Sequence, residues 1–193
     1  MSRPRLRLGI DLDGVCADFN VGWTRRYNAA FGTGLVHTDV VAWDGVVGLT
    51  HFEDMDEFWS WARAERPSFF RDLPVVPGAL ETLQELARRR HRIVVITAKP
   101  RWAVPDTLAW LAEHELPVDE VHFTFDKPSV PADVYLDDAP SFLRGLVERR
   151  PGATVCRFVR PWNEPVGGAV DVAGWTEFAE VVEELETARA RSS

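Results

Sequence analysis

Apolar residues occur along this chain in two alternating patterns, as short continuous runs and as stripes at helical spacing. Residues 92–97 (RIVVIT) form a continuous apolar run, which is typical of a strand buried on both faces of a sheet. Four shorter segments have similar strand character and are bounded by turn residues: 6–12, 119–124, 133–136 and 154–159. The pattern therefore predicts five strands.

Helical periodicity fills most of the segments between these strands. Residues 77–90 begin with a proline and carry leucines on one face, and residues 175–185 carry an apolar stripe that includes two aromatic rings. Further helices are predicted over 102–114 and 139–150, each directly after a strand. Because strands and helices alternate, we predict an α/β fold: a Rossmann-like parallel sheet with helices on both faces.

One long segment interrupts this alternation. Residues 15–75 contain no convincing buried strand and have the pattern of helices at 17–31 and 53–65, with turn-rich sequence between them. We therefore predict a small helical cap at 15–75, inserted after the first strand of a core domain formed by 1–14 and 76–193. Ligands bind at the carboxyl ends of the strands in such sheets, so a cap leaving the first strand there would cover the site.

Composition removes several classes of function. The hydrophobic fraction of 46% is ample for a packed core, and the net charge of -8, without any basic run, makes binding to a nucleic acid polymer unexpected. No apolar stretch approaches the length of a membrane span, and the N-terminus lacks the apolar region of a secretory signal, so we expect a cytoplasmic protein. Cys16 and Cys156 are too few for a disulfide scaffold and are expected to be buried thiols.

Two carboxylates stand at the end of the first predicted strand, in Asp11-Leu12-Asp13-Gly14. The Asp-x-Asp pattern alone is weak, since it also occurs in turns and in calcium loops. A calcium loop of the EF-hand type that began at Asp11 would need a glutamate at its twelfth position, where this chain has Gly22. The preceding strand and the following glycine favour a site at the carboxyl edge of the sheet.

Polar residues also follow later strands. Thr97 ends the strand at 92–97, where its hydroxyl could either cap the next helix or hold a phosphate oxygen, and Lys99 could add a positive charge. Lys127 lies in a predicted loop, where a single lysine usually faces solvent.

Asp137 and Asp138 follow the strand at 133–136. Adjacent carboxylates repel each other unless a cation or hydrogen-bond donors offset their charge, so they form either an exposed turn or a metal site. With Asp11 at a nearby strand end, a shared Mg²⁺ is the better interpretation.

The order of these motifs along the chain is more specific than any one of them. Over residues 6–138 it resembles the four-motif signature of the haloacid dehalogenase superfamily. The resemblance implies a phosphatase in which Asp11 is the nucleophile that takes the phosphate, Asp13 is the general acid and base, and Lys127 is a catalytic cation.

The same resemblance implies a Mg²⁺ cofactor and a phosphate-binding group. The metal would be held by Asp11, the backbone carbonyl of Asp13, and Asp137. Asp138 would bind it through a water or would orient Lys127. The phosphate-binding residues would be Thr97, Ala98 and Lys99.

A narrower resemblance concerns residues 11–20, Trp43-Asp44, 68–86 and Arg160–Asn163. These segments are similar to the 5'(3')-deoxyribonucleotidase family and its bacterial relatives, which have a small helical cap and remove phosphate from nucleoside monophosphates. The resemblance implies a nucleoside monophosphate as substrate. It also implies that Phe19 lies beside the base and that Trp43 takes part in substrate binding.

Six aromatic residues of the predicted cap are further candidates for stacking on a base. Rings at helical spacing usually belong to a core, so we expect most of the six to pack there: Trp23, Trp43, Phe52, Trp59, Trp61 and Phe69.

The chain departs from the family pattern on the phosphate side. Ala98 stands where the family has serine, Phe125 where an arginine is expected, and Ala139 where an arginine is common. These departures concern the substrate more than the reaction, because the nucleophile, the acid and the metal carboxylates all remain.

Two other functions stay open from the sequence. The protein could be a phosphatase of the same fold that acts on a sugar phosphate or a biosynthetic intermediate, or a non-catalytic nucleotide-binding protein. The presence of both Asp11 and Asp13 argues against the second. The sequence leaves open the base, the sugar and whether the protein is a homodimer.

Overall fold

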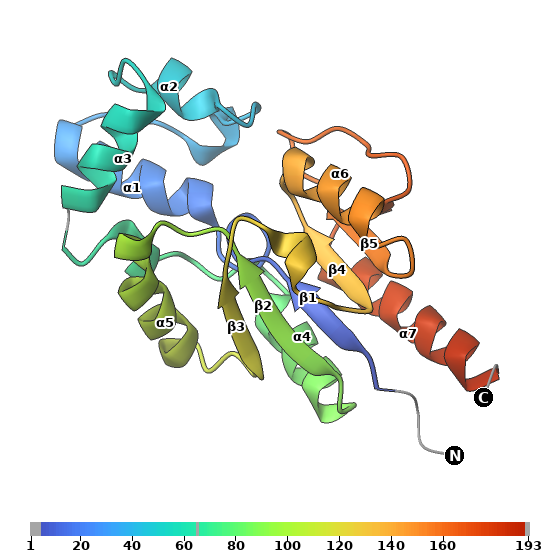
Figure 1. Ribbon diagram of the computed structural model, residues 1–193. Coiled ribbons are helices and arrows are strands. Elements are labelled where there is room, and N and C mark those ends of the chain that lie inside the picture. The colour runs from blue at the N-terminus through green and yellow to red at the C-terminus, as the bar shows by residue number, and fades with distance from the viewer. Residues whose placement is uncertain (1–4, 65, 192–193) are drawn as a thin grey trace.

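A parallel sheet with the strand order β3-β2-β1-β4-β5-β6 lies at the centre of the computed structural model, which describes residues 5–64 and 66–191 (Figure 1). The strands are β1 (Arg7–Ile10), β2 (Arg92–Thr97), β3 (Glu120–Phe123), β4 (Val134–Asp137), β5 (Thr154–Phe158) and β6 (Val170–Val172). The five predicted strands are confirmed. The sequence analysis missed β6, because this edge strand has three residues of which only Val172 is buried.

Helices connect the strands and also occur in the long segment after β1. They are α1 (Phe19–Phe31), α2 (Gly45–Leu49), α3 (Met55–Ala64), α4 (Ala79–Arg88), α5 (Val104–Glu113), α6 (Pro140–Arg149) and α7 (Trp175–Arg191). Short 3-10 turns occur at η1 (His37–Asp39), η2 (Phe69–Arg71), η3 (Arg101–Ala103) and η4 (Lys127–Ser129). Helix α7 extends beyond the apolar stripe at 175–185 and continues through a polar stretch to Arg191.

Local sequence explains where several helices begin and end. The side chain of Asp18 accepts a hydrogen bond from the backbone N–H of Val21 and so caps α1, which ends at Gly32 in a left-handed conformation. Prolines stand in the first turn of α5 and α6, where a missing N–H costs nothing. These local signals mark helix ends in the sequence.

The two faces of the sheet are buried under different helices. Alternate residues of β2 point to opposite faces, so Ile93 and Val95 join one apolar cluster while Val94 and Ile96 join another. The larger cluster includes apolar residues of α4, α5 and α7, and the smaller one includes those of α6. The sheet is therefore covered on both faces, which explains the continuous apolar runs in its strands.

Helices α1, α2 and α3 lie beyond the carboxyl ends of the strands (Figure 1). Their aromatic rings pack against one another, as Trp23 does against Phe58, and they join the same apolar cluster as the sheet residues. Because this cluster runs through both parts, the division into a core (1–14 and 76–193) and a cap (15–75) stays a prediction.

Two smaller predictions have clear outcomes. Cys16 and Cys156 are buried free thiols, as expected. Within residues 5–64 and 66–191, no helix is both long enough and apolar enough to cross a bilayer.

Close packing at the middle of β1 yields a test of the fold. A Cβ added at Gly9 would lie 2.8 Å from Cδ1 of Ile96 and 2.9 Å from Cδ1 of Tyr135. Gly9→Ala is therefore expected to lower the free energy of unfolding by about 1–3 kcal/mol, measured by urea denaturation. The control is Gly152→Ala, where a Cβ would meet nothing within 4 Å. Equal stability of the two variants would contradict this packing.

Candidate active site

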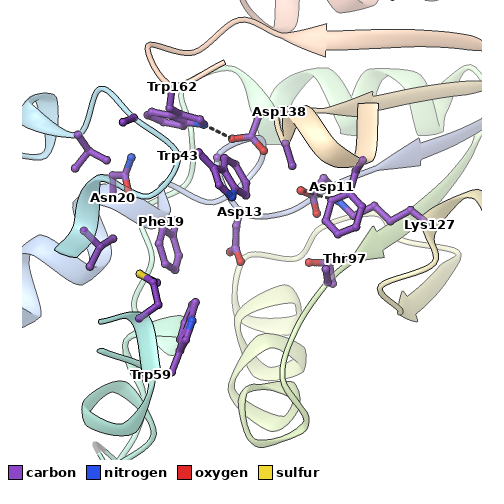
Figure 2. Close-up of a pocket in the computed structure, with 18 residues that line it drawn as sticks. Asp11, Asp13, Phe19, Asn20, Trp43, Trp59, Thr97, Lys127, Asp138 and Trp162 are labelled. Carbon is purple, nitrogen blue, oxygen red and sulfur yellow. Dashed lines mark hydrogen bonds and ion pairs between the residues drawn. The ribbon is translucent and has the colours of Figure 1, made fainter. Parts of the chain in front are cut away.

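A pocket opens where β1, β2 and β4 end, beneath the helices of the segment after β1 (Figure 2). Figure 2 shows Asp11, Thr97 and Lys127 on one wall and Phe19 and Trp59 on the facing wall. The residues that line the pocket are Asp11, Asp13, Gly14, Phe19, Asn20, Val40, Ala42, Trp43, Val46, Met55, Trp59, Thr97, Ala98, Lys127, Asp138, Ala139, Phe142 and Trp162. The carboxyl edge of the sheet thus faces an apolar surface.

Three buried carboxylates meet at this edge. Oxygens of Asp11, Asp137 and Asp138 all lie within 4.8 Å of one another. The Lys127 ammonium lies 3.0 Å from Oδ2 of Asp11 and donates a hydrogen bond of 2.5 Å to Oδ2 of Asp137. One ammonium can neutralise the charge of only one of three ionised carboxylates, so a further cation would stabilise the group.

Burial changes the ionisation of these groups. It raises the pKa of Asp137 to about 6, although Lys127 opposes this change. Burial also raises the pKa of Asp138 well above its usual value, and the charges on Asp11 and Asp137 add to the effect. Burial alone would lower the pKa of Lys127, but Asp11 and Asp137 raise it, so this side chain remains charged. The carboxylates gain a strong electrostatic benefit from any bound cation.

The donor set suits Mg²⁺, which prefers carboxylate and carbonyl oxygens. Oδ1 of Asp138 is buried and has no hydrogen-bond partner among the described residues, while Oδ2 accepts a hydrogen bond of 2.8 Å from Nε1 of Trp162. A metal ion would satisfy an unpartnered oxygen on a carboxylate that is grouped with two others. Asp11, Asp137 and Asp138 therefore fit a divalent cation.

Asp13 points away from this carboxylate group. Its two oxygens lie 2.6 and 2.7 Å from the ammonium of Lys99, which also lies 3.8 Å above the ring centre of Phe70. Burial raises the pKa of Asp13, and Lys99 partly opposes the increase. The side chain of Asp13 therefore lies outside the metal group, and its predicted contribution as a ligand concerns its backbone carbonyl only.

Backbone geometry requires a glycine directly after Asp13. Gly14 has φ of +76°, a conformation that side chains rarely adopt, and a Cβ there would collide with the carboxylate of Asp138. The turn after β1 therefore passes directly against the residue that follows β4.

The predicted phosphate-binding residues are separated in the structure. Thr97 and Ala98 line the pocket, and the Thr97 hydroxyl has no hydrogen-bond partner in the described chain. Lys99 is not part of the lining, because its ammonium is held by Asp13. Phe125, which replaces an expected arginine, is 69% exposed and lies outside the pocket lining.

The pocket wall formed by the helical segment is mainly apolar. Phe19 packs against Trp59, Phe69 and Phe70, and its ring also lines the pocket. Trp43 lines the pocket as well and is 56% exposed. Among the other predicted aromatics, Trp59 lines the pocket, whereas the remaining four belong to the apolar cluster or pack against it: Trp23, Phe52, Trp61 and Phe69.

Sequence reasoning missed two polar contributions to this site. Asn20 lines the pocket and is oriented by the indole N–H of Trp23, which donates a hydrogen bond of 2.9 Å to Oδ1 of Asn20. Trp162 lines the pocket and holds Asp138. The motif Arg160–Asn163 was a signal for the second contact, but nothing in its pattern indicates the carboxylate that it binds.

Comparisons with known proteins agree with this geometry. The profile of the family described as "5' nucleotidase, deoxy (Pyrimidine), cytosolic type C protein" matches residues 5–191. A candidate 5'(3')-deoxyribonucleotidase of Chlorobaculum tepidum is 31% identical over 149 residues, which are 72% of this chain and 73% of that protein. The mitochondrial 5'(3')-deoxyribonucleotidase of Mus musculus is 27% identical over 160 residues, which are 72% of this chain and 67% of that protein.

Similarity in structure extends to more distant enzymes. The HAD-hydrolase YfnB of Bacillus subtilis, solved with bound magnesium, superposes with a TM-score of 0.64 at 12% identity, over 93% of this chain and 99% of that one. Such a low identity shows the fold alone, whereas the family profile covers nearly the whole chain. The chain therefore belongs to the 5' nucleotidase, deoxy (pyrimidine), cytosolic type C family, a family of phosphatases with the fold of the haloacid dehalogenase superfamily.

Proposed function

We propose that this protein is a Mg²⁺-dependent phosphomonoesterase that removes phosphate from (deoxy)ribonucleoside monophosphates through a phosphorylated Asp11. The observation that carries the proposal is the placement of Asp11. Its carboxylate lies on the pocket wall, 3.0 Å from the ammonium of Lys127, with Asp13 two residues away. The proposed nucleophile and its cation are thus adjacent on the pocket wall, and the proposed acid lines the same pocket.

Phosphoryl transfer would begin at the carboxylate of Asp11. One oxygen attacks phosphorus, the bond from phosphorus to the leaving oxygen breaks, and an aspartyl phosphate forms. Lys127 favours this step, because its positive charge reduces the repulsion between the anionic nucleophile and the phosphate. Thr97 would donate its free hydroxyl to a phosphate oxygen.

Asp13 would act as general acid and then as general base. It would give a proton to the leaving alcohol, a role that burial favours by raising its pKa and that Lys99 opposes. The same carboxylate then takes a proton from the water that attacks the aspartyl phosphate, which restores Asp11 and releases inorganic phosphate.

Mg²⁺ would be held by Asp11, Asp137 and Asp138, with the backbone carbonyl of Asp13 as a further ligand. When bound, it supplies positive charge that neutralises the phosphate.

The apolar wall supports a leaving group with a flat apolar surface. Phe19, Trp43 and Trp59 line the pocket opposite the carboxylates, so a base could lie against a ring while its phosphate faces Asp11. The names of the Chlorobaculum and mouse relatives support a nucleotide in particular. A cytosolic human relative supports a cytoplasmic location, and a homodimer stays open.

The substrate is tested with a panel of deoxyribonucleotides, ribonucleotides and sugar monophosphates, with phosphate release as the readout. We expect the highest kcat/KM for a nucleoside monophosphate, and activity that EDTA abolishes and Mg²⁺ restores. A clear preference for a sugar phosphate would retain the phosphatase chemistry but overturn the nucleotide assignment.

The role of Asp13 predicts a dependence on the leaving group. Asp13→Asn cannot supply a proton, so the first-turnover rate with a deoxynucleotide is expected to fall by about 10²–10⁴-fold. An activated aryl phosphate needs little protonation, so its first turnover should fall much less, measured by rapid quench. Equal losses with both substrates would contradict the role of Asp13 as acid.

The crowding of the carboxylates predicts that a residue needed for metal binding lowers the stability of the metal-free protein. In EDTA at neutral pH, Asp138→Asn is expected to have a higher Tm than the wild type. It removes a buried carboxyl group that the folded protein keeps only by holding a proton or by burying a charge without a cation. The raised pKa of Asp138 means that the folded state retains a proton that the unfolded chain loses. The Tm difference should therefore widen as pH rises from about 4 to 7.

Mg²⁺ provides the control for this prediction. It should raise the Tm of the wild type by binding the folded state and should raise that of Asp138→Asn much less. If the wild type is more stable than the variant in EDTA, the claim that Asp138 destabilises the metal-free protein is wrong.

A further inference from the structure

Trp162 contacts both the substrate pocket and the carboxylate group. Its ring lines the pocket, and its indole N–H donates a hydrogen bond of 2.8 Å to Oδ2 of Asp138 (Figure 2). We propose that Trp162 is a positioning residue for the metal ligand Asp138. The proposal rests on the Mg²⁺ site of the proposed function and goes beyond it by assigning a residue that orients the ligand.

The contact determines which oxygen of Asp138 is free. An indole N–H can only donate, so it binds one carboxylate oxygen and cannot compete for the metal. Oδ2 is thereby occupied, and Oδ1 stays buried without a partner in the described chain. The Asp138 carboxylate belongs to the group in which one oxygen each of Asp11, Asp137 and Asp138 lies within 4.8 Å of the others. Without the indole, the carboxylate could rotate or swap its oxygens, and the ligand would lose its fixed direction.

The turn that carries Trp162 is itself held rigidly. The side chain of Asn163 donates to the backbone carbonyls of Asp138 (2.7 Å) and Phe158 (2.9 Å). Its Oδ1 accepts from the guanidinium of Arg157 (2.8 Å) and the backbone N–H of Arg160 (3.0 Å). Asn163 is buried and uses both ends of its amide, so the turn is tied to the backbone of the residue whose side chain Trp162 holds.

A third contact connects this turn to the loop after β1. The guanidinium of Arg160 donates a hydrogen bond of 2.7 Å to the backbone carbonyl of Gly14 and lies 4.2 Å above the ring centre of Phe158. The turn at 160–163 thus bridges the loop that follows Asp13 and the residue that follows β4. A position fixed from both sides is what an orienting hydrogen bond requires.

Trp162→Phe tests the proposal, because it removes the N–H donor and keeps an aromatic ring. Mg²⁺ affinity, measured by isothermal titration calorimetry without substrate, is expected to fall by about 10–100-fold, the usual effect of losing an outer-shell partner of a metal ligand. At saturating Mg²⁺, kcat should recover substantially and the KM for substrate should change little. A purely structural defect would not be repaired by added metal.

Trp43→Phe is the matched control. Trp43 lines the same pocket, but its indole N–H forms no hydrogen bond with any described residue. This variant should change Mg²⁺ affinity by less than about threefold, since no hydrogen bond to a ligand is lost. Equal Mg²⁺ affinities of wild type and Trp162→Phe would overturn the proposal. Failure of the wild type to bind Mg²⁺ would overturn the metal site and this proposal with it.

A second measurement uses the wild-type protein, so it remains decisive if the variant does not fold. In ¹⁵N-labelled protein, the indole N–H of Trp162 should exchange with solvent much more slowly than that of Trp43 and should shift when Mg²⁺ is added. Exchange as fast as that of Trp43, or no response to Mg²⁺, would overturn the proposal.

Discussion

The crowding of three carboxylates at one edge of the sheet is the constraint on which the rest of the site depends. Asp11, Asp137 and Asp138 are buried within 4.8 Å of one another, and the ammonium of Lys127 neutralises only part of their charge. Such a group is costly unless a cation completes it. The crowding arises because the parallel strands β1 and β4 end side by side. Asp11 and Asp137 are therefore close together although they are 126 positions apart in the sequence.

The two walls of the pocket differ in chemistry. The wall at the carboxyl edge of the sheet carries charge and hydrogen-bond donors, suited to phosphate and metal. The wall formed by α1 and the residues after it carries aromatic and aliphatic side chains, suited to an apolar leaving group. Phe19 connects the walls, because it follows the turn after β1 and packs against Trp59 and Phe70.

Sequence alone predicted the architecture because its signals are local. The apolar run of β2, the prolines that begin α5 and α6, and the Asp-x-Asp-Gly turn each need only neighbouring residues to be recognised. The carboxylate group followed from one further rule, that the carboxyl ends of parallel strands share one edge.

The remaining features depend on contacts that no local pattern encodes. Lys99 pairs with Asp13 across 86 positions, so its side chain is directed away from the pocket lining where a phosphate group was expected. Trp162 reaches Asp138 across 24 positions. Strand β6 was not predicted, because it is short and largely exposed and lies at the edge of the described sheet beside β5. In each case a long-range contact determines the structure.

The central claim is that Asp11 takes the phosphoryl group. It is tested most directly by acid quench of Asp13→Asn during reaction with an activated aryl phosphate, followed by peptide mass spectrometry. This variant lacks the base for hydrolysis, so the account predicts that phosphate accumulates on the peptide containing Asp11, with a stoichiometric burst of aryl alcohol. The variant that also carries Asp11→Asn should give neither. Turnover without any phosphorylated Asp11, or phosphate on a different residue, would contradict the account.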